Sequence, residues 1–137
     1  GVRRIRWKWR AVVLPKHGNE CADGYGDSAA AVYITWKSGL RWYSLKFIWS
    51  TDAKIGQTCN QKRNPFVFQD SIVLHSGTTS ADWVQEEIDP AWLFQKHFID
   101  TGETDAYPEL QGFGILTDGD QTHSESAADY TDFEFLK

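Results

Sequence analysis

The sequence predicts an all-β fold: an antiparallel β-sandwich of jelly-roll or galactose-binding-like type with one short helix, or alternatively a partly open barrel. Three observations lead to this class. Apolar and polar residues alternate in several short runs, turn residues separate the runs, and one segment has helical spacing. The 137 residues include seven Trp, eight Phe and five Tyr, enough to fill one hydrophobic core. We therefore expect residues 1–137 to form a single sandwich domain.

The first half of the chain predicts a strand followed by a hairpin. Residues 4–14 alternate with a period of two, so that one face of the strand is apolar and the other is basic. Residues 15–26 contain Pro, Asn, Asp and Gly, which are typical of a loop. Two further strands, 29–36 and 40–49, enclose a tight turn at Ser38-Gly39 and are expected to pair as a hairpin.

The second half predicts more strands and the helix. The strands are expected at residues 66–74, 82–88, 112–117 and 131–136. A helix is expected to start at Asp89-Pro90, because Asp caps helices and Pro fits the first turn, and Phe94 and Phe98 follow at helical spacing. Residues 50–65 and 101–111 lack periodicity and are predicted to be loops.

Cys21 and Cys59 both lie in polar, loop-like sequence, where free thiols would be exposed to oxidation. We predict a disulfide between the two loops, which implies an oxidising, periplasmic or extracellular location. Two unrelated thiols are the alternative, since spacing alone does not bring the Cα atoms together. The chain has no Met, so we expect Gly1 not to be the translation start.

The overall charge argues against two classes of partner. The net charge of -5 and the pI near 5.3 disfavour a nucleic acid or an anionic membrane surface as the partner. No apolar run approaches the ~20 residues that a membrane-spanning helix needs, so no membrane span is expected.

The acidic loop before the last strand is a candidate cation site. Its polar residues are Asp118, Asp120, Thr122, His123, Ser124 and Glu125, and Asp129 follows them. Carboxylate and hydroxyl oxygens are ligands that Ca²⁺ prefers, so Asp118, Asp120 and Asp129 are the predicted metal ligands. His123 stands where an EF-hand loop needs glycine, which excludes that motif. A solvated turn, in which Asp and Thr bind their own backbone, is the alternative.

Aromatic side chains on a sandwich can stack on sugar rings while polar neighbours bind the hydroxyl groups. The available platforms are Trp36, Trp42, Trp49, Trp83 and Trp92. Trp42 is the best candidate, because the opposite face of its strand is more continuously apolar. The alternative for any single Trp is a place in the core.

Charged residues on the strands suggest weaker functional interpretations. The basic face of residues 4–10 could bind an acidic polysaccharide, but cross-strand pairing with Asp132 and Glu134 is the favoured explanation. Glu87 could form an acid/base pair with Asp118 or Asp120. Asp27 could join that pair.

Five sequence blocks occur in a fixed order along the chain: IRWKWRAVVLP, GYGDSAAAVYITW, LKFIWS, WVQEEID and GFGILTDGDQTHSESAADYTDFEF. In these blocks and their order the chain resembles a bacterial family known as domain of unknown function three-zero-four-seven. The resemblance implies a carbohydrate-binding-module-like sandwich without an established activity. Members usually carry further strands before the Trp-rich block, so we expect this chain to lack them, or a neighbouring chain or an N-terminal segment to supply them. The cysteine pair is not a feature we associate with the whole family.

Together these observations predict a non-catalytic ligand-binding domain with a glycan as its ligand. The predicted ligand-binding residues are Asp27, Trp42, Glu87, Asp118, Asp120 and His123, with Ca²⁺ as the possible cofactor. A structural or assembly module completed by strands of another chain or an N-terminal segment is the alternative. A glycoside-processing enzyme is the third interpretation.

Overall fold

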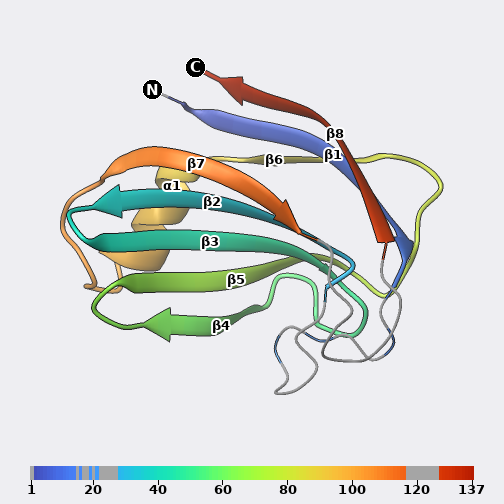
Figure 1. The fold of residues 1–137 in the computed structure, drawn as a ribbon, viewed down its shortest axis with the longest axis horizontal. Coiled ribbons are helices and arrows are strands. Elements are labelled where there is room, and N and C mark those ends of the chain that lie inside the picture. Colours follow the sequence, from blue (N-terminus) through green and yellow to red (C-terminus); the bar gives the residue numbers. More distant parts are fainter. Residues whose placement is uncertain (1, 15, 17–18, 20, 22–27, 117–126) are drawn as a thin grey trace.

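The computed structural model describes residues 2–14, 16, 19, 21, 28–116 and 127–137. In these residues eight strands form two sheets that pack face to face (Figure 1). The strands are β1 (Arg4–Val13), β2 (Ala30–Ser38), β3 (Arg41–Ser50), β4 (Thr58–Arg63), β5 (Val67–Ser76), β6 (Val84–Ile88), β7 (Glu109–Leu116) and β8 (Ala127–Leu136). Between β6 and β7, helix α1 (Pro90–Phe94) continues into a π-helical turn, η1 (Gln95–Ile99). The predicted all-β sandwich with one short helix is confirmed.

The smaller sheet has the order β6-β1-β8 and is antiparallel throughout. Its central strand β1 follows the predicted alternation, because Ile5, Trp7 and Trp9 are buried while the intervening basic side chains face outward. A bulge interrupts β8 opposite Trp7, and there Asp132 adopts a positive φ of 55°. Such a bulge bends an edge strand and increases its twist.

The larger sheet has the order β4-β5-β3-β2-β7 and is mixed. The predicted hairpin of β2 and β3 is confirmed, with Ala30 opposite Trp49 and Ser38 opposite Arg41. One pair departs from the antiparallel pattern, because β3 and β5 run parallel. The reason is β4, which lies in the segment predicted to be a loop and takes the sheet edge, so that β5 returns between β4 and β3.

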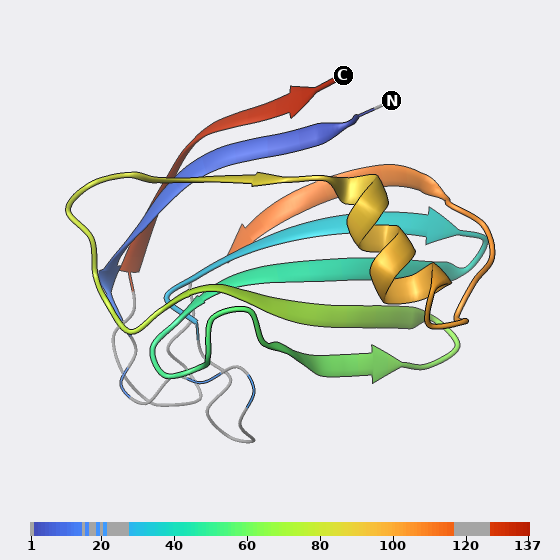
Figure 2. The same ribbon diagram turned by 180° about the vertical axis from the view of Figure 1, so that it is seen from behind.

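The helix covers the core on the face of the larger sheet that also packs on the smaller sheet (Figure 2). It starts where the sequence predicts, since the Asp89 carboxylate accepts a 3.1 Å hydrogen bond from the Trp92 N–H and Pro90 occupies the first turn. Phe94 and Phe98 are fully buried among the core aromatics. Among the described residues, neither helical segment has the length and apolar character needed to cross a membrane.

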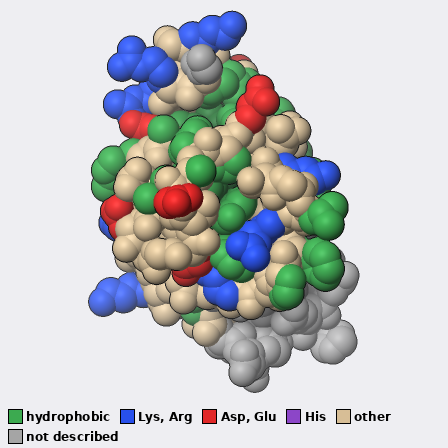
Figure 3. Space-filling view, turned by 90° about the vertical axis from the view of Figure 1, so that its left-hand side faces the viewer, with side chains coloured by type: hydrophobic (Ala, Val, Ile, Leu, Met, Phe, Trp, Pro, Cys, Tyr) green, Lys and Arg blue, Asp and Glu red, His purple; other side chains and the backbone are tan. Residues whose placement is uncertain are grey.

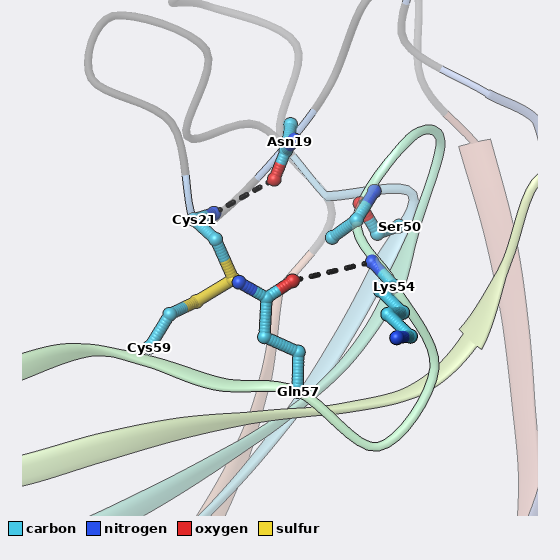
Figure 4. The surroundings of a disulfide bond; sticks show 7 residues. Asn19, Cys21, Ser50, Lys54, Gln57 and Cys59 are labelled. Carbon is cyan, nitrogen blue, oxygen red and sulfur yellow. Dashed lines mark hydrogen bonds between the residues drawn. A yellow bond between two sulfur atoms is a disulfide. The ribbon is translucent and has the colours of Figure 1, made fainter.

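The predicted disulfide between Cys21 and Cys59 is confirmed, with a Cα–Cα distance of 5.3 Å (Figure 4). Cys59 lies on β4 and not in a loop as predicted. The backbone N–H of Cys21 donates to the side-chain oxygen of Asn19 at 3.0 Å. The bond ties Cys21 to β4 beside a second apolar cluster, which consists of Ala31, Ile48, Ala53 and Val73 with Cys21 and Tyr33 packed against it.

Candidate binding surface

Four of the predicted ligand-binding residues, Asp27, Asp118, Asp120 and His123, lie outside the described residues. The Ca²⁺ site that would join two of them to Asp129 therefore stays a prediction. Asp129 itself accepts a 2.9 Å hydrogen bond from Arg10 Nε across the β1–β8 pair. Within the described ranges, no group of three or more His, Cys, Asp or Glu side chains could hold a metal ion.

The two adjacent carboxylates of β6 have different partners on opposite faces. Glu87 accepts hydrogen bonds from Arg6 Nε at 3.0 Å and Arg6 Nη2 at 2.8 Å. Glu86 points toward the core, where it accepts a 3.3 Å hydrogen bond from Trp9 Nε1. The acid/base pairing proposed for Glu87 involves aspartates outside the described part of the chain, so it also stays a prediction.

Carboxylates from three other segments pair with the basic outer face of β1. The pairs are Arg4 with Asp89 at 3.1 Å, Arg6 with Glu87 at 2.8 Å and Glu134 at 3.6 Å, Lys8 with Asp132 at 3.4 Å, and Arg10 with Asp129 at 2.9 Å. These side chains are largely solvated, so each pair contributes about 0–1 kcal/mol. Cross-strand pairing, the favoured explanation for this basic face, is therefore what the structure shows.

The outer face of the larger sheet, which faces the viewer in Figure 1, is the best candidate for a binding surface. Strand alternation places Trp42 and Ser44 on this face, because the intervening Tyr43 belongs to the buried core. The registers then place Lys37 opposite Trp42, and Thr35 opposite Ser44.

Gln69 extends the same row from β5, since it lies beside Ser44 in the parallel pair. We call these five residues the outer strip: Thr35, Lys37, Trp42, Ser44 and Gln69. The outer strip combines the exposed Trp42 indole with one amide, one ammonium group and two hydroxyl groups, although Ser44 is only 6% exposed. Such a set can cover an apolar ring face and exchange hydrogen bonds with hydroxyl groups.

Three indoles are exposed to solvent: Trp42 at 39%, Trp83 at 42% and Trp92 at 57%. Each has a cation over its ring, namely Lys37 at 4.8 Å, Arg10 at 4.4 Å and Lys96 at 4.9 Å from the centroid, respectively. The other two platforms considered, Trp36 and Trp49, are buried in the core, so the core explanation holds for them. Trp42 is not the most exposed indole, but it is the one that lies in a sheet face among neighbouring polar side chains in register.

A buried ionic network under the helix was not predicted from the sequence. Asp70 on β5 is 1% exposed and accepts hydrogen bonds from Arg63 Nη1 at 2.9 Å, Arg63 Nη2 at 3.3 Å and His97 Nδ1 at 2.7 Å. Arg63 also donates to Glu103 at 2.9 Å. Asp70 stands between apolar residues at alternating positions, and this inward-facing carboxylate was the signal that could have revealed the network.

The network displaces the pKa values of its members. Burial alone would raise the pKa of the Asp70 carboxyl, but the hydrogen bonds from His97 and Arg63 outweigh burial and hold this pKa below its ordinary value. Burial alone would lower the pKa of Arg63, and its hydrogen bonds to Asp70 and Glu103 raise it instead. These charges connect η1 and the following loop to β4 and β5, so the displaced pKa values have a structural cause.

A second polar contact connects the two sheets. His75 of β5 contacts the Glu86 carboxylate of β6 through Nε2, and the same carboxylate accepts from Trp9 of β1. The His75 ring lies 4.8 Å from that of Trp49, at an interplanar angle of 32°. Because Glu86 has partners from both sheets, we assign it to sandwich packing.

Basic side chains gather at the end of the molecule where β1 begins and β8 ends (Figure 3). A shallow pocket of about 460 Å³ opens there, and Arg3, Arg4 and Lys137 contribute to its lining together with apolar side chains. Arg4 is paired with Asp89 in this pocket. A neighbouring pocket is lined by Tyr107, whose pKa is raised chiefly by burial and whose hydroxyl accepts a 3.2 Å hydrogen bond from buried Trp36.

Comparison with known proteins identifies a family and leaves its activity open. No curated protein and no solved structure matches the chain significantly. A sequence profile described as "Protein of unknown function (DUF3047)" matches residues 2–134, which include all eight strands at least in part. This is the family that the ordered sequence blocks indicated. The chain therefore belongs to the DUF3047 family of proteins of unknown function.

Proposed function

We propose that this protein is a non-catalytic glycan-binding domain and that the glycan binds across the outer strip. The observation that carries the proposal is the exposed Trp42 indole in a sheet face whose neighbouring side chains are hydrogen-bonding groups. The apolar face of a sugar ring packs on an indole, while its hydroxyl groups need nearby donors and acceptors. The outer strip offers both kinds of contact within one row of the sheet.

The charge on this surface favours an acidic sugar over a neutral one. Lys37 belongs to the outer strip, and Lys62 lies on the same face because it pairs with Gln69. On the other side of Lys37, the acidic residue Glu109 of β7 pairs with it in register. A uronic acid or sulfated sugar that stacks on Trp42 would bring its charge next to the Lys37 ammonium group, although the whole chain is acidic. Lys62 lies three strands away on β4, so a further acidic residue of the same glycan would reach it.

Lys37 has a second effect, because its ammonium group covers one face of the Trp42 ring. A cation–π contact at an exposed site contributes about 0.5–1 kcal/mol, so a sugar that stacks on that face must displace the ammonium group. An acidic sugar would compensate for this displacement by pairing with Lys37. We therefore expect Lys37→Ala to weaken binding of an acidic glycan and to strengthen binding of a neutral one by up to about fivefold.

The disulfide supports a periplasmic or extracellular location for this domain, because such bonds persist in oxidising compartments. Glycans are abundant there. The acidic loop with Asp118 and Asp120 is the proposed place for Ca²⁺, so binding is to be measured both with Ca²⁺ and with a chelator.

A glycan array followed by calorimetry tests the proposal. We expect the wild-type protein to bind acidic polysaccharides, and Trp42→Ala to weaken binding about tenfold. Trp92→Ala is the matched control, because this indole is also exposed and also has a lysine over its ring. The proposal is wrong if no glycan binds with or without Ca²⁺, or if the two variants lose affinity equally.

A further inference from the structure

An apolar seam lies open between the two sheets on the side away from β4. Phe113 of β7 packs on two rings of β8, with centroid distances of 5.2 Å to Phe133 and 5.1 Å to Phe135. Yet Phe113 is 48%, Ile115 51% and Phe135 40% exposed. We call Phe113, Ile115, Phe133 and Phe135 the aromatic seam.

The exposure of the aromatic seam is unusual for its position in the sheets. Phe113 is in register with Ile34 and Ile115 with Val32, and both partners on β2 are buried in the core. On the same face of the larger sheet, the side chains of β2 are therefore fully covered, whereas those of the adjacent strand β7 are half exposed. Among the described strands the smaller sheet ends at β8, so the seam lacks the cover that one more strand beside β8 would give.

Both strands beside the aromatic seam are sheet edges. Among the described strands, β8 pairs with β1 alone and β7 pairs with β2 alone. Figures 1 and 2 place β8 and β7 on the same side of the molecule, each as the outermost strand of its sheet. An edge strand presents backbone N–H and C=O groups to which an extended segment can add.

The acidic side chains on the outer face of β8 would favour an added segment with basic side chains. Asp132 and Glu134 point to that face and are half exposed, and each has a cation of β1 on one side only, Lys8 at 3.4 Å and Arg6 at 3.6 Å. The strand that already pairs with β8 alternates apolar residues toward the core with basic residues toward these carboxylates. A strand on the other side of β8 would meet the same two surfaces.

We propose that the free edge of β8 binds an extended peptide segment of another protein, in which apolar residues alternate with lysine or arginine. The apolar side chains cover the aromatic seam, and the basic ones pair with Asp132 and Glu134. This proposal concerns a different surface from the outer strip and does not depend on glycan binding. The sequence suggested, as an alternative, a module that a strand of another chain completes. The proposal specifies where that strand binds and which side chains it carries.

A second copy of this chain fits the edge poorly. Two β8 strands paired across a twofold axis would place carboxylates of one copy near carboxylates of the other, and like charges across a sheet are destabilising. The bulge at Asp132 also restricts the edge, because it breaks the register between Thr131 and Glu134. Backbone pairing is therefore expected over residues 133–136, and a long basic side chain at the end of the bound segment reaches Asp132 beside them.

Three short synthetic peptides test the proposal with the full chain. In each of them valine alternates with one other residue, which is lysine, serine or glutamate. We expect the lysine peptide to bind about tenfold more tightly than the glutamate peptide, with the serine peptide between them, because two cross-strand charge contacts change sign. Hydrogen exchange with the lysine peptide bound is expected to protect amides of residues 133–136.

Two variants distinguish binding at the aromatic seam from non-specific hydrophobic binding. Phe135→Ser should weaken binding of the lysine peptide about tenfold. Leu40→Ser, at a highly exposed residue in the turn between β2 and β3 of the larger sheet, should have no effect. Equal binding of the lysine and glutamate peptides would overturn the proposal. Hydrogen-exchange protection of β4 in place of β8 would also overturn it. This second measurement uses only the wild-type protein, so it does not depend on whether a variant folds.

Discussion

The most informative single substitution is Asp70→Asn, because it removes one charge from the buried network and keeps the shape of the side chain. The Asp70 carboxylate accepts three hydrogen bonds, two from Arg63 and one from His97. An asparagine offers one acceptor oxygen and turns two N–H groups toward these donors. Breaking a buried ion pair in this way costs about 3–5 kcal/mol, and the remaining acceptor places our expectation near 3 kcal/mol.

Urea denaturation at neutral pH measures this cost, and thermal unfolding provides a second reading. With about 2.1 cal/mol/K of unfolding entropy per residue, the 137-residue chain should lose about 10 °C in Tm. Glu87→Gln is the matched control, since it makes the same chemical change at a solvated pair with Arg6 and should cost about 0–1 kcal/mol. Equal losses for the two variants would refute the assignment of Asp70 as the buried anchor of the helix.

Three further predictions concern stability. Because the Asp70 pKa is lowered in the folded state, its stabilisation is complete above the unfolded-state pKa of about 3.9 and is lost as pH falls through the folded value. The stability difference between wild type and Asp70→Asn should therefore shrink below about pH 4; a constant difference would contradict this. Replacing Cys21 and Cys59 by alanine opens a loop with a sequence separation of 38 and should cost about 4 kcal/mol in urea denaturation; an unchanged midpoint would contradict the role of the bond. Asp89→Ala removes the cap that accepts from the Trp92 N–H and should cost about 1 kcal/mol, whereas Asp89→Asn should retain most of it.

The sequence predicted those elements whose pattern is local. The alternation of β1, the Ser38-Gly39 turn and the Asp89 cap each depend on residues a few positions apart, and the structure contains all three. Strand β4 was missed because its sequence, TCNQKR, is polar and lies at a sheet edge, where little apolar surface is buried. The parallel pairing of β3 and β5 follows from the place of β4, so it was missed for the same reason.

The candidate surfaces were predicted less completely, because they depend on neighbours distant in sequence. Trp42 was selected from the alternation of its own strand. The polar residues Thr35 and Gln69 come from the two neighbouring strands, where they are in register with Ser44. The aromatic seam needed both sheets to be placed, since Phe113 and Phe135 have ordinary inward-facing patterns in the sequence. They stay half exposed because, in the part of the chain that the structure describes, no strand lies beyond the edges formed by β7 and β8.

The indole N–H resonances in an NMR titration test the central claim most directly. The chain has seven Trp residues, and four of them, Trp7, Trp9, Trp36 and Trp49, are buried in the core. When an acidic glycan that the protein binds is titrated in, we predict that the Trp42 resonance shifts in a saturable way. The resonances of the buried indoles and of Trp92 should not shift. A saturable shift at Trp92 with none at Trp42 would contradict glycan binding at the outer strip.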